Sequence, residues 1–261
     1  METVRIFVGC ASNNEDLESQ VVLEYTLRKF ASQPLQITWM QLSRDPYSPF
    51  YSSPERGQGW RTQQWATPFS GLRWAIPALC KFHGKGIYLD SDFIFLDDIA
   101  KLWNQPIAEG RLIIAADRSR LDCSVWNCAK FAGETWDLTW LQRKEGSATA
   151  AASRLNANTI QPFADGNWNV MDISMPADIN TPSIKAIHYT QMHTQPQLKY
   201  AIPRLRAAGT KHWYTRATKP HPREDLQALF DREYEEAQSK GITIAKYQKE
   251  PYGKYTIRGI G

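Results

Sequence analysis

The 261-residue sequence lacks any uninterrupted apolar run of about 18 residues, the least that a membrane-spanning helix needs. Its start, METVRIFVGC, has the apolar pattern of a strand rather than that of a secretory leader. We therefore expect a cytoplasmic protein without a transmembrane segment. The formal net charge of +4 leaves peripheral contact with the anionic inner face of a membrane open.

Cysteine is scarce, and the four cysteines are isolated from one another: Cys10, Cys80, Cys123 and Cys128. No CxxC motif is present, and no His–Cys cluster has the spacing of a zinc finger. The pattern favours buried or free thiols in a reducing compartment. The chain also lacks a dense stripe of lysine and arginine, so nucleic acid is not an expected partner.

Aromatic residues, by contrast, are plentiful, with 10 Trp, 11 Tyr and 10 Phe. Aromatic side chains bury large areas, and the core is their usual place. A surplus of this size also suits a protein that stacks flat faces, such as sugar rings or bases, against its side chains.

Strand and helix patterns alternate from the N-terminus, which indicates a parallel sheet and an α/β fold. An apolar strand pattern at residues 4–9 is followed by a helical pattern with Leu23, Leu27 and Phe30 on one face. A second strand is predicted at residues 35–42. Later strands are predicted at residues 86–89, 111–116, 121–128 and 183–189.

Helices are predicted at residues 71–82, where Pro77 kinks or restarts the helix, and at residues 222–237. Pro222 stands near the first turn of the second helix, and Gly241 follows its end.

No internal repeat, low-complexity tract or domain linker interrupts the chain, so we predict a single domain over residues 1–261. Residues 145–155 are small and helix-prone. The basic, aromatic stretch at residues 246–259 is expected to be a solvated tail, with contact to a membrane or another subunit as the alternative.

An apolar strand pattern, residues 87–89, ends at two carboxylates, Asp90 and Asp92. Side chains two apart in a strand point the same way, and ligands of α/β sheets bind beyond the carboxyl ends of the strands. Mg²⁺ and Mn²⁺ take oxygen ligands and keep positions for phosphate. The pattern predicts a cation that holds a diphosphate, with an acidic turn as the alternative. The pair Asp97 and Asp98 fits a helix N-terminus instead.

Residues 86–103, GIYLDSDFIFLDDIAKLW, resemble the signature of GT-A-fold nucleotide-sugar glycosyltransferases, most closely glycosyltransferase family 8. That signature is an apolar strand, YLD-x-D, an apolar triplet and D-I-x-x-L-W. The resemblance covers about residues 3–200. It implies an α/β, GT-A-like fold with a Rossmann-type central mixed sheet flanked by helices, and it leaves residues 201–261 as a C-terminal helical extension.

The activity implied by the resemblance is metal-dependent transfer of a sugar from a nucleotide-diphosphate donor, with a UDP-sugar expected, to a saccharide or glycolipid acceptor. Family 8 enzymes retain the anomeric configuration. The segment AIHYTQMHTQP resembles the family's HF-x-G-x-x-KPW, and this makes His188 the third ligand of Mn²⁺ or Mg²⁺, beside Asp90 and Asp92. The alternative for His188 is a structural histidine.

The resemblance also implies contacts to donor and acceptor. The first strand and helix of the family cradle the nucleotide, and the segment before the metal motif carries an arginine that reaches the nucleotide-sugar. The segment ADGNWNVMD resembles PDQD-x-x-N, which faces donor sugar and acceptor. The implied nucleotide-sugar contacts are Val8, Gly9, Cys10, Arg73 and Ser91. The implied catalytic residue is Asp165, and the implied substrate contacts include Gly166 and Trp168.

These assignments have structural alternatives. Arg73 fits an ordinary salt bridge, Asp165 a turn, and Trp168 the core. Trp60 and Trp65, in the long irregular segment 44–70, are expected to be exposed and to form a lid over the donor.

The sequence departs from the family in two places. The family's FNAGVMLIN segment is LDCSVWNCA here, so that Asp122 and Ser124 replace its asparagine-containing core. The diphosphate-binding lysine of the KPW motif is missing, and Lys199 or His193 is expected to substitute for it. Gln191 and His193 are further expected substrate contacts.

Two other classes of function stay open. A sugar-nucleotide nucleotidyltransferase would normally have a basic, glycine-rich phosphate loop after the first strand. The corresponding segment here, VGCASNNED, has neither lysine nor arginine. A carbohydrate- or nucleotide-binding module without catalysis is the non-enzyme alternative.

Overall fold

The computed structural model describes residues 2–132, 137–143 and 148–258. A six-stranded sheet in the order β2-β1-β5-β8-β7-β9 forms its centre. The strands are β1 (Val4–Gly9), β2 (Leu35–Met40), β5 (Lys85–Asp90), β7 (Ile113–Asp117), β8 (Arg120–Asn127) and β9 (Ile160–Gln161). β1 runs parallel to β2 and β5, and β7 to β9, whereas β8 is antiparallel to both neighbours. The sheet is therefore mixed, as expected.

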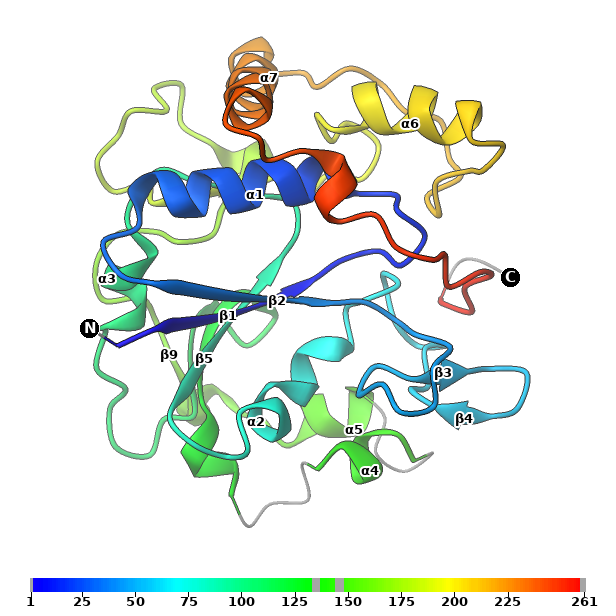
Figure 1. The fold of residues 1–261 in the computed structure, drawn as a ribbon. Helices are drawn as coiled ribbons and strands as arrows, with labels where there is room; N and C mark the ends of the chain where they lie inside the picture. The colour runs from blue at the N-terminus through cyan, green and yellow to red at the C-terminus, as the bar shows by residue number, and fades with distance from the viewer. Residues whose placement is uncertain (1, 133–136, 144–147, 259–261) are drawn as a thin grey trace.

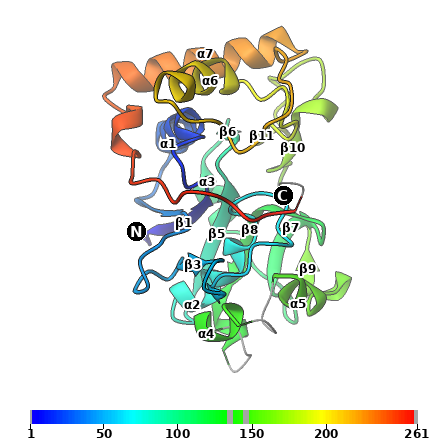
Figure 2. The same cartoon turned by 90° about the vertical axis from the view of Figure 1, so that its right-hand side faces the viewer.

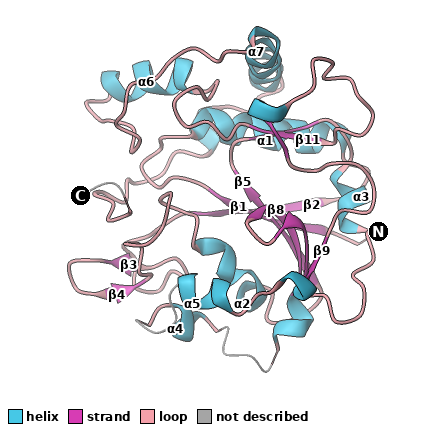
Figure 3. Cartoon of the chain, turned by 180° about the vertical axis from the view of Figure 1, so that it is seen from behind, coloured by secondary structure: helices cyan, strands magenta, loops and turns pink. Residues whose placement is uncertain are grey.

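Helices cover both faces of this sheet (Figure 1). On one side lies α1 (Leu17–Phe30), with α6 (Leu198–Ala207) and α7 (Glu224–Ser239) beyond it. On the other side lie α2 (Ile76–Leu79), α4 (Leu138–Leu141) and α5 (Ala148–Ser153). Figure 3 shows the same layers from behind, with β8 and β9 between α1 and α5. The predicted α/β architecture is confirmed.

The strands alternate between the two layers because successive side chains of a strand point to opposite faces. Ile6 and Val8 of β1 pack beneath Leu23 of α1. Phe7 points the other way, into a cluster with Tyr88 and the helices on the α2 side. All four cysteines are buried and free, as predicted.

A small second sheet, in the order β10-β11-β6, begins beyond the carboxyl end of β5. Its strands are β6 (Phe93–Phe95), β10 (Val170–Met171) and β11 (Ala186–His188). β6 follows β5 after a turn at residues 91–92, and β11 pairs with it in antiparallel register. The chain then enters α3 (Ile99–Trp103), where the Asp98 side chain accepts from the Ala100 amide at 2.9 Å. The predicted helix N-terminus at Asp97 and Asp98 is confirmed.

The segment at residues 44–70 contains a short hairpin, β3 (Ser52–Ser53) with β4 (Gln58–Gly59). Trp60 and Trp65 are only 2% and 3% exposed, and their rings meet edge to face at 5.8 Å. The Trp60 indole donates to the Pro49 carbonyl at 2.9 Å. The expectation of two exposed tryptophans that form a lid is wrong, because the rings pack into the core.

The later helices differ slightly from expectation. α7 begins at Glu224, so Pro222 lies ahead of the helix rather than in its first turn, and the predicted helix at 222–237 is shifted along the chain. Gly241, with φ of 78°, follows the C-cap Lys240 and ends the helix as predicted. Pro77 lies in the first turn of α2, after a 3₁₀ turn at Leu72–Ala75, and restarts the helix.

The C-terminal segment, residues 249–258, runs from the end of the α7 region across the molecule (Figure 2, red). Its side chains Tyr252, Tyr255 and Ile257 are buried at 5%, 6% and 4% exposure. The expectation of a solvated tail is therefore wrong, because these side chains join the core cluster on the α2 side of the sheet. Residues 259–261 of the predicted extension and residues 145–147 of the predicted helical stretch lie outside the described residues.

Within the described ranges, no helix combines the length and the apolar content that crossing a bilayer requires.

Candidate functional site

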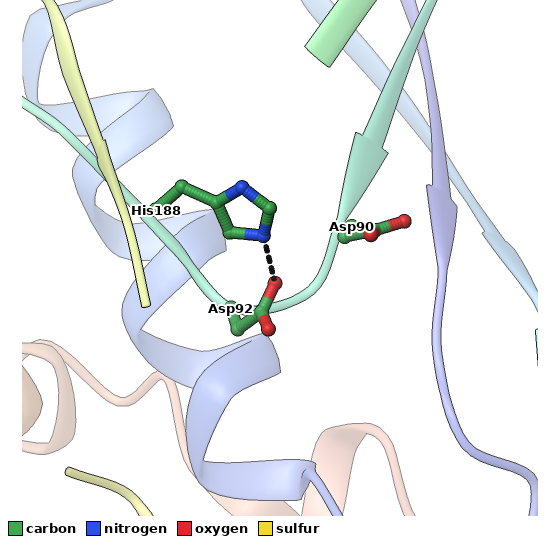
Figure 4. A group of neighbouring side chains, drawn as sticks. All are labelled: Asp90, Asp92 and His188. Carbon is green, nitrogen blue, oxygen red and sulfur yellow. Dashed lines mark ion pairs between the residues drawn. The ribbon is translucent and has the colours of Figure 1, made fainter. Parts of the chain in front are cut away.

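The carboxyl end of β5 places two carboxylates and one histidine together (Figure 4). Asp90 is the last residue of β5, and Asp92 ends the turn before β6. β11 pairs with β6 so that His188 lies opposite Phe93, and the Tyr189 amide donates to the Asp92 carbonyl at 3.0 Å. The imidazole of His188 stacks on the Phe93 ring at 4.1 Å. Strand pairing thus sets the position of His188.

The three side chains fit a divalent cation. One ligand atom from each of Asp90, Asp92 and His188 lies within 4.8 Å of the other two. Asp92 Oδ1 is buried without a hydrogen-bond partner, and His188 Nε2 lies 3.2 Å from it. His188 Nδ1 lies 3.0 Å from the Asn169 side-chain oxygen, so that a proton on Nδ1 leaves Nε2 available to a metal. The structure brings the three predicted ligands together.

Two arginines hold a third carboxylate, Asp122 of β8, beside this group. Arg73 lies 3.4 Å from Asp90 Oδ1 and 3.5 Å from Asp122 Oδ1, and Arg120 lies 3.2 Å from Asp122 Oδ2. The Arg73 guanidinium also lies 4.5 Å from the centre of the Tyr88 ring. Arg73 is only 9% exposed, so the salt-bridge alternative describes its surroundings.

The pKa values of these groups are shifted by burial and by their neighbours. Burial raises the pKa of Asp90 to about 7, even though Arg73 opposes the rise. Burial also acts to raise the pKa of Asp122, but Arg73, His188 and Arg120 outweigh it and hold that pKa below its ordinary value. For His188, burial acts to lower the pKa, and the carboxylate of Asp92 outweighs it and raises the pKa.

A cavity of about 450 Å³ opens beside the cluster. Its walls come from Asp16 in the loop after β1, the end of β5, the start of β8, residues 212–216 and Arg258, and from some of the residues within 66–69 and 188–197. Five of the predicted site residues line it: Asp90, Ser91, Asp92, Asp122 and His188.

Other predicted contacts lie away from the cavity wall. Val8 and Cys10 have 0% exposure at the end of β1. A Cβ atom on Gly9 would lie 2.3 Å from the Tyr88 hydroxyl, so glycine there makes room for the hydrogen bond from Tyr88 to Asp90. These residues support the site from behind.

The residues expected to replace the missing lysine also lie away from the cavity wall. Lys199 Nζ pairs with Asp231 at 2.8 Å on the α6–α7 surface. Gln191 and His193 do not line the cavity either. Ser124 is fully buried in β8, where its hydroxyl donates to the Leu121 carbonyl.

The turn that resembles PDQD-x-x-N holds Asp165 outside the cavity lining. The Asp165 carboxylate accepts hydrogen bonds from Gln105 and from Trp168, the latter at 3.3 Å. Gly166, with φ of 71°, makes the turn beside it and is also absent from the cavity wall. Trp168 has 0% exposure and packs against Phe95, so the core alternative holds for it and sugar stacking is excluded.

Sequence reasoning missed several residues of the site. Asn169, four residues after Asp165, orients His188. Gln195 donates to Asp92 Oδ2 at 2.6 Å, and Ser91 donates to Asp16 Oδ2 at 2.6 Å. The sequence offers a signal for Asn169 alone, because this residue lies within the segment ADGNWNVMD. The prediction selected Asp165, Gly166 and Trp168 from that segment instead.

The sequence matches no protein-family model and no curated protein. Solved structures, however, are similar in fold. The chain superimposes on the glycosyltransferase GlyE of Streptococcus pneumoniae with a TM-score of 0.53 and 15% identity, over 97% of this chain and 66% of that one. The galactosyltransferase LgtC, in complex with donor and acceptor sugar analogs, superimposes with a TM-score of 0.53 and 10% identity. The match covers 92% of this chain and 100% of that one.

A third similar structure, the bifunctional glycosyltransferase WbbM, has a TM-score of 0.51 and 14% identity, over 74% of this chain and 46% of that one. The chain thus spans less than two thirds of the length of GlyE and WbbM. At these identities the likeness shows the fold alone. The chain has a GT-A-like fold.

Proposed function

We propose that this protein is a metal-dependent glycosyltransferase of the family 8 type. It would move a sugar from a nucleotide-diphosphate donor, expected to be a UDP-sugar, to a saccharide or glycolipid acceptor, with retention of the anomeric configuration. The observation that carries the proposal is the group of Asp90, Asp92 and His188 at the carboxyl end of β5, beside a cavity in a GT-A-like fold. The complex of LgtC with donor and acceptor sugar analogs supports the same class of reaction.

In this proposal Asp90, Asp92 and His188 hold Mn²⁺ or Mg²⁺, which supplies positive charge to the leaving diphosphate. The chain fixes its ligands before substrate arrives. The Asn169 side chain hydrogen-bonds to Nδ1 of His188 and so orients the imidazole ring. Gln195 donates to Oδ2 of Asp92, and His188 lies beside the other oxygen, Oδ1. Groups fixed in this way need little reorganisation during the reaction, which is the main source of electrostatic rate enhancement.

The two arginines let three carboxylates lie close together. Without compensation, Asp90, Asp92 and Asp122 would repel one another in a partly buried site. Arg73 bridges Asp90 and Asp122, and Arg120, which lines the cavity, also pairs with Asp122. Asp92 is thereby left as the carboxylate with no arginine partner among the described residues, and it is the one best placed to bind the cation.

Calorimetric titration with UDP, with and without Mn²⁺, tests the proposal on the wild type and on Asp92→Ala. We expect wild-type binding to require the metal, and Asp92→Ala to lose it. Glu235→Ala, which removes a carboxylate from the exposed face of α7, is the matched control and should bind as the wild type does. Binding that is indifferent to both metal and Asp92, or no binding to any nucleoside diphosphate, would overturn the proposal.

Turnover separates the enzyme from a binding module. Slow release of UDP from a UDP-sugar without acceptor, dependent on Mn²⁺ and Asp92, is expected of a transferase. A nucleotidyltransferase would instead release pyrophosphate from a nucleoside triphosphate and a sugar phosphate.

A further inference from the structure

The cavity beside the metal-ligand group carries two arginines that form no ion pair with any described residue. Its acidic wall consists of Asp16, Asp90, Asp92 and Asp122. Of the three arginines that line it, Arg120 pairs with Asp122 at 3.2 Å. Arg216 and Arg258 have no carboxylate at ion-pair distance within the part of the chain that the structure describes. An unpaired guanidinium in a cavity is a place for an anionic ligand.

Arg258 belongs to the C-terminal segment, residues 249–258, which is firmly attached to the loop after β1. The Ser12 amide donates to the Tyr255 hydroxyl at 2.6 Å, and that hydroxyl donates to Glu15 at 2.8 Å. Asn13 and Gly253 exchange two hydrogen bonds of 2.8 Å each. Because these bonds are specific and partly buried, the segment has one defined position.

A second set of bonds fixes the very end of this segment. The Thr62 hydroxyl donates to the Thr256 carbonyl at 2.5 Å, and the Arg258 amide donates to the Trp65 carbonyl at 3.0 Å. The buried side chain of Ile257 lies between these two attachments. The backbone of Arg258 is therefore held at the cavity, although its side chain is exposed.

Arg216 comes from a different part of the chain, residues 212–216 after α6. His212 anchors this stretch: it is 9% exposed, and its Nδ1 accepts from the Tyr214 amide at 3.0 Å. Burial, with Arg204 adding to it, lowers the pKa of His212 to about 4, so the histidine is neutral at pH 7. The positive charge of this wall therefore comes from Arg216.

We propose that Arg216 and Arg258 together bind the diphosphate of the nucleotide ligand, in place of the lysine that the sequence lacks. This inference rests on the proposed function, because it takes the metal-bound ligand to be a nucleoside diphosphate. A guanidinium matches phosphate oxygens through two parallel N–H bonds, which a lysine cannot provide. Lys199 pairs with Asp231 on the outer surface and does not line the cavity.

Titration with UDP in the presence of Mn²⁺ tests the pair on Arg216→Gln, Arg258→Gln and the double variant. Each single change should weaken UDP binding by about tenfold or more, because a charge-assisted hydrogen bond is lost. The affinity of the double variant should also fall less steeply with added salt than that of the wild type. Thermal unfolding midpoints equal to the wild type would show that the exposed substitutions leave the fold intact.

Two variants provide matched controls. Lys254→Gln removes one positive charge from the same C-terminal segment, and Arg206→Gln removes one from the end of α6; neither residue lines the cavity. Both should bind UDP as the wild type does. An equal loss in the controls would mean a general effect of charge and would overturn the assignment of the pair.

The remaining outcomes separate this inference from the proposed function. If both arginine variants bind like the wild type while Asp92→Ala loses binding, the pair does not bind phosphate and the metal proposal stands. If the wild type binds no nucleoside diphosphate with the metal present, both proposals fail.

Discussion

Glu15 shows how a single buried carboxylate responds to the C-terminal segment. It is 1% exposed and accepts hydrogen bonds from the Asn13 amide and the Tyr255 hydroxyl, at 2.9 and 2.8 Å. Burial raises its pKa from an ordinary value of 4.5 to about 7, although the bond from Tyr255 opposes the rise. The folded protein therefore favours the protonated form of Glu15.

The raised pKa of Glu15 makes the folded state less stable as the pH rises. Between pH values of about 4.5 and about 7 the folded state keeps a proton that the unfolded state has released. The contribution of Glu15 to the free energy of unfolding is thus fully present below a pH of about 4.5, and it is lost as the pH rises through about 7. The loss is at most about 1.4 kcal/mol per unit of pKa difference.

We expect Glu15→Gln to remove this loss of stability at higher pH, because glutamine does not titrate. Urea unfolding at pH 5, 6 and 8 should show that the free energy of unfolding of the variant, relative to the wild type, increases with pH. Glu250→Gln, which removes an exposed carboxylate from the C-terminal segment, is the matched control and should leave the difference from the wild type unchanged with pH. A variant whose difference from the wild type does not change with pH would contradict the assignment.

Individual site residues could be predicted where a local pattern and its register determine them. Asp90 and Asp92 follow from an apolar strand that ends at a turn. His188 was predicted as a ligand only through the resemblance of AIHYTQMHTQP to the family's motif, because a lone histidine after a strand equally suits a structural role. Asn169 and Arg120 were not selected from the sequence, although Asn169 lies within the segment ADGNWNVMD, because their partner His188 is reached only through long-range strand pairing.

At the scale of elements, α7 stabilises the strand that carries the histidine. Its face buries Leu226, Leu229 and Phe230 in a cluster with Leu17 and Val21 of α1. The Tyr189 hydroxyl, one residue after His188, donates to the Leu226 carbonyl at 2.9 Å. The helix therefore holds both α1 and the end of β11.

Truncation of Phe230 tests this contact. Phe230 is 2% exposed and lies beside the rings of Tyr189 and Tyr234. Phe230→Ala should lower the free energy of unfolding by about 3–5 kcal/mol, because it leaves a cavity in the cluster. Glu235→Ala, on the exposed face of the same helix, should change it by less than about 0.5 kcal/mol. Urea unfolding measures both, and equal effects would show that α7 is not packed as described.

Elements with long local patterns were predictable, and most of the short ones were not; β11 is an exception, because the strand predicted at residues 183–189 contains it. The strand expected at residues 4–9 is β1, and that at residues 86–89 extends by one residue at each end as β5. The sheet of β6, β10 and β11 has strands of two or three residues. Such strands are too short for an alternating pattern, and they exist because distant segments pair.

At the scale of the whole molecule, the C-terminal extension shares its cores with the rest of the chain. Residues of α7 lie in one cluster with α1, and Tyr252, Tyr255 and Ile257 lie in another with the residues around α2. We therefore propose that residues 201–258 do not form a separable unit. The lack of a linker already predicted a single domain, but the burial of residues 249–258 was not predicted, because aromatic residues in a basic stretch also suit a solvated tail.

A single cooperative unfolding transition is the expected consequence. Tryptophan fluorescence and far-ultraviolet circular dichroism should report the same urea midpoint within error. A variant that ends at residue 207 should fail to show that transition, since it exposes the apolar face of α1. Two separated transitions in the full chain would contradict a shared core.

The attachment of the C-terminal segment also determines when the cavity can be completed during biosynthesis. The hydrogen bond from Ser12 to Tyr255 joins residues 243 positions apart. Closing so long a loop costs entropy before the contact is made, and contacts of this kind form late in folding. The ribosome synthesises the loop after β1 early, but Arg258, which lines the cavity, is absent until residues 249–258 have emerged. Until then a nascent chain lacks the complete ligand cavity.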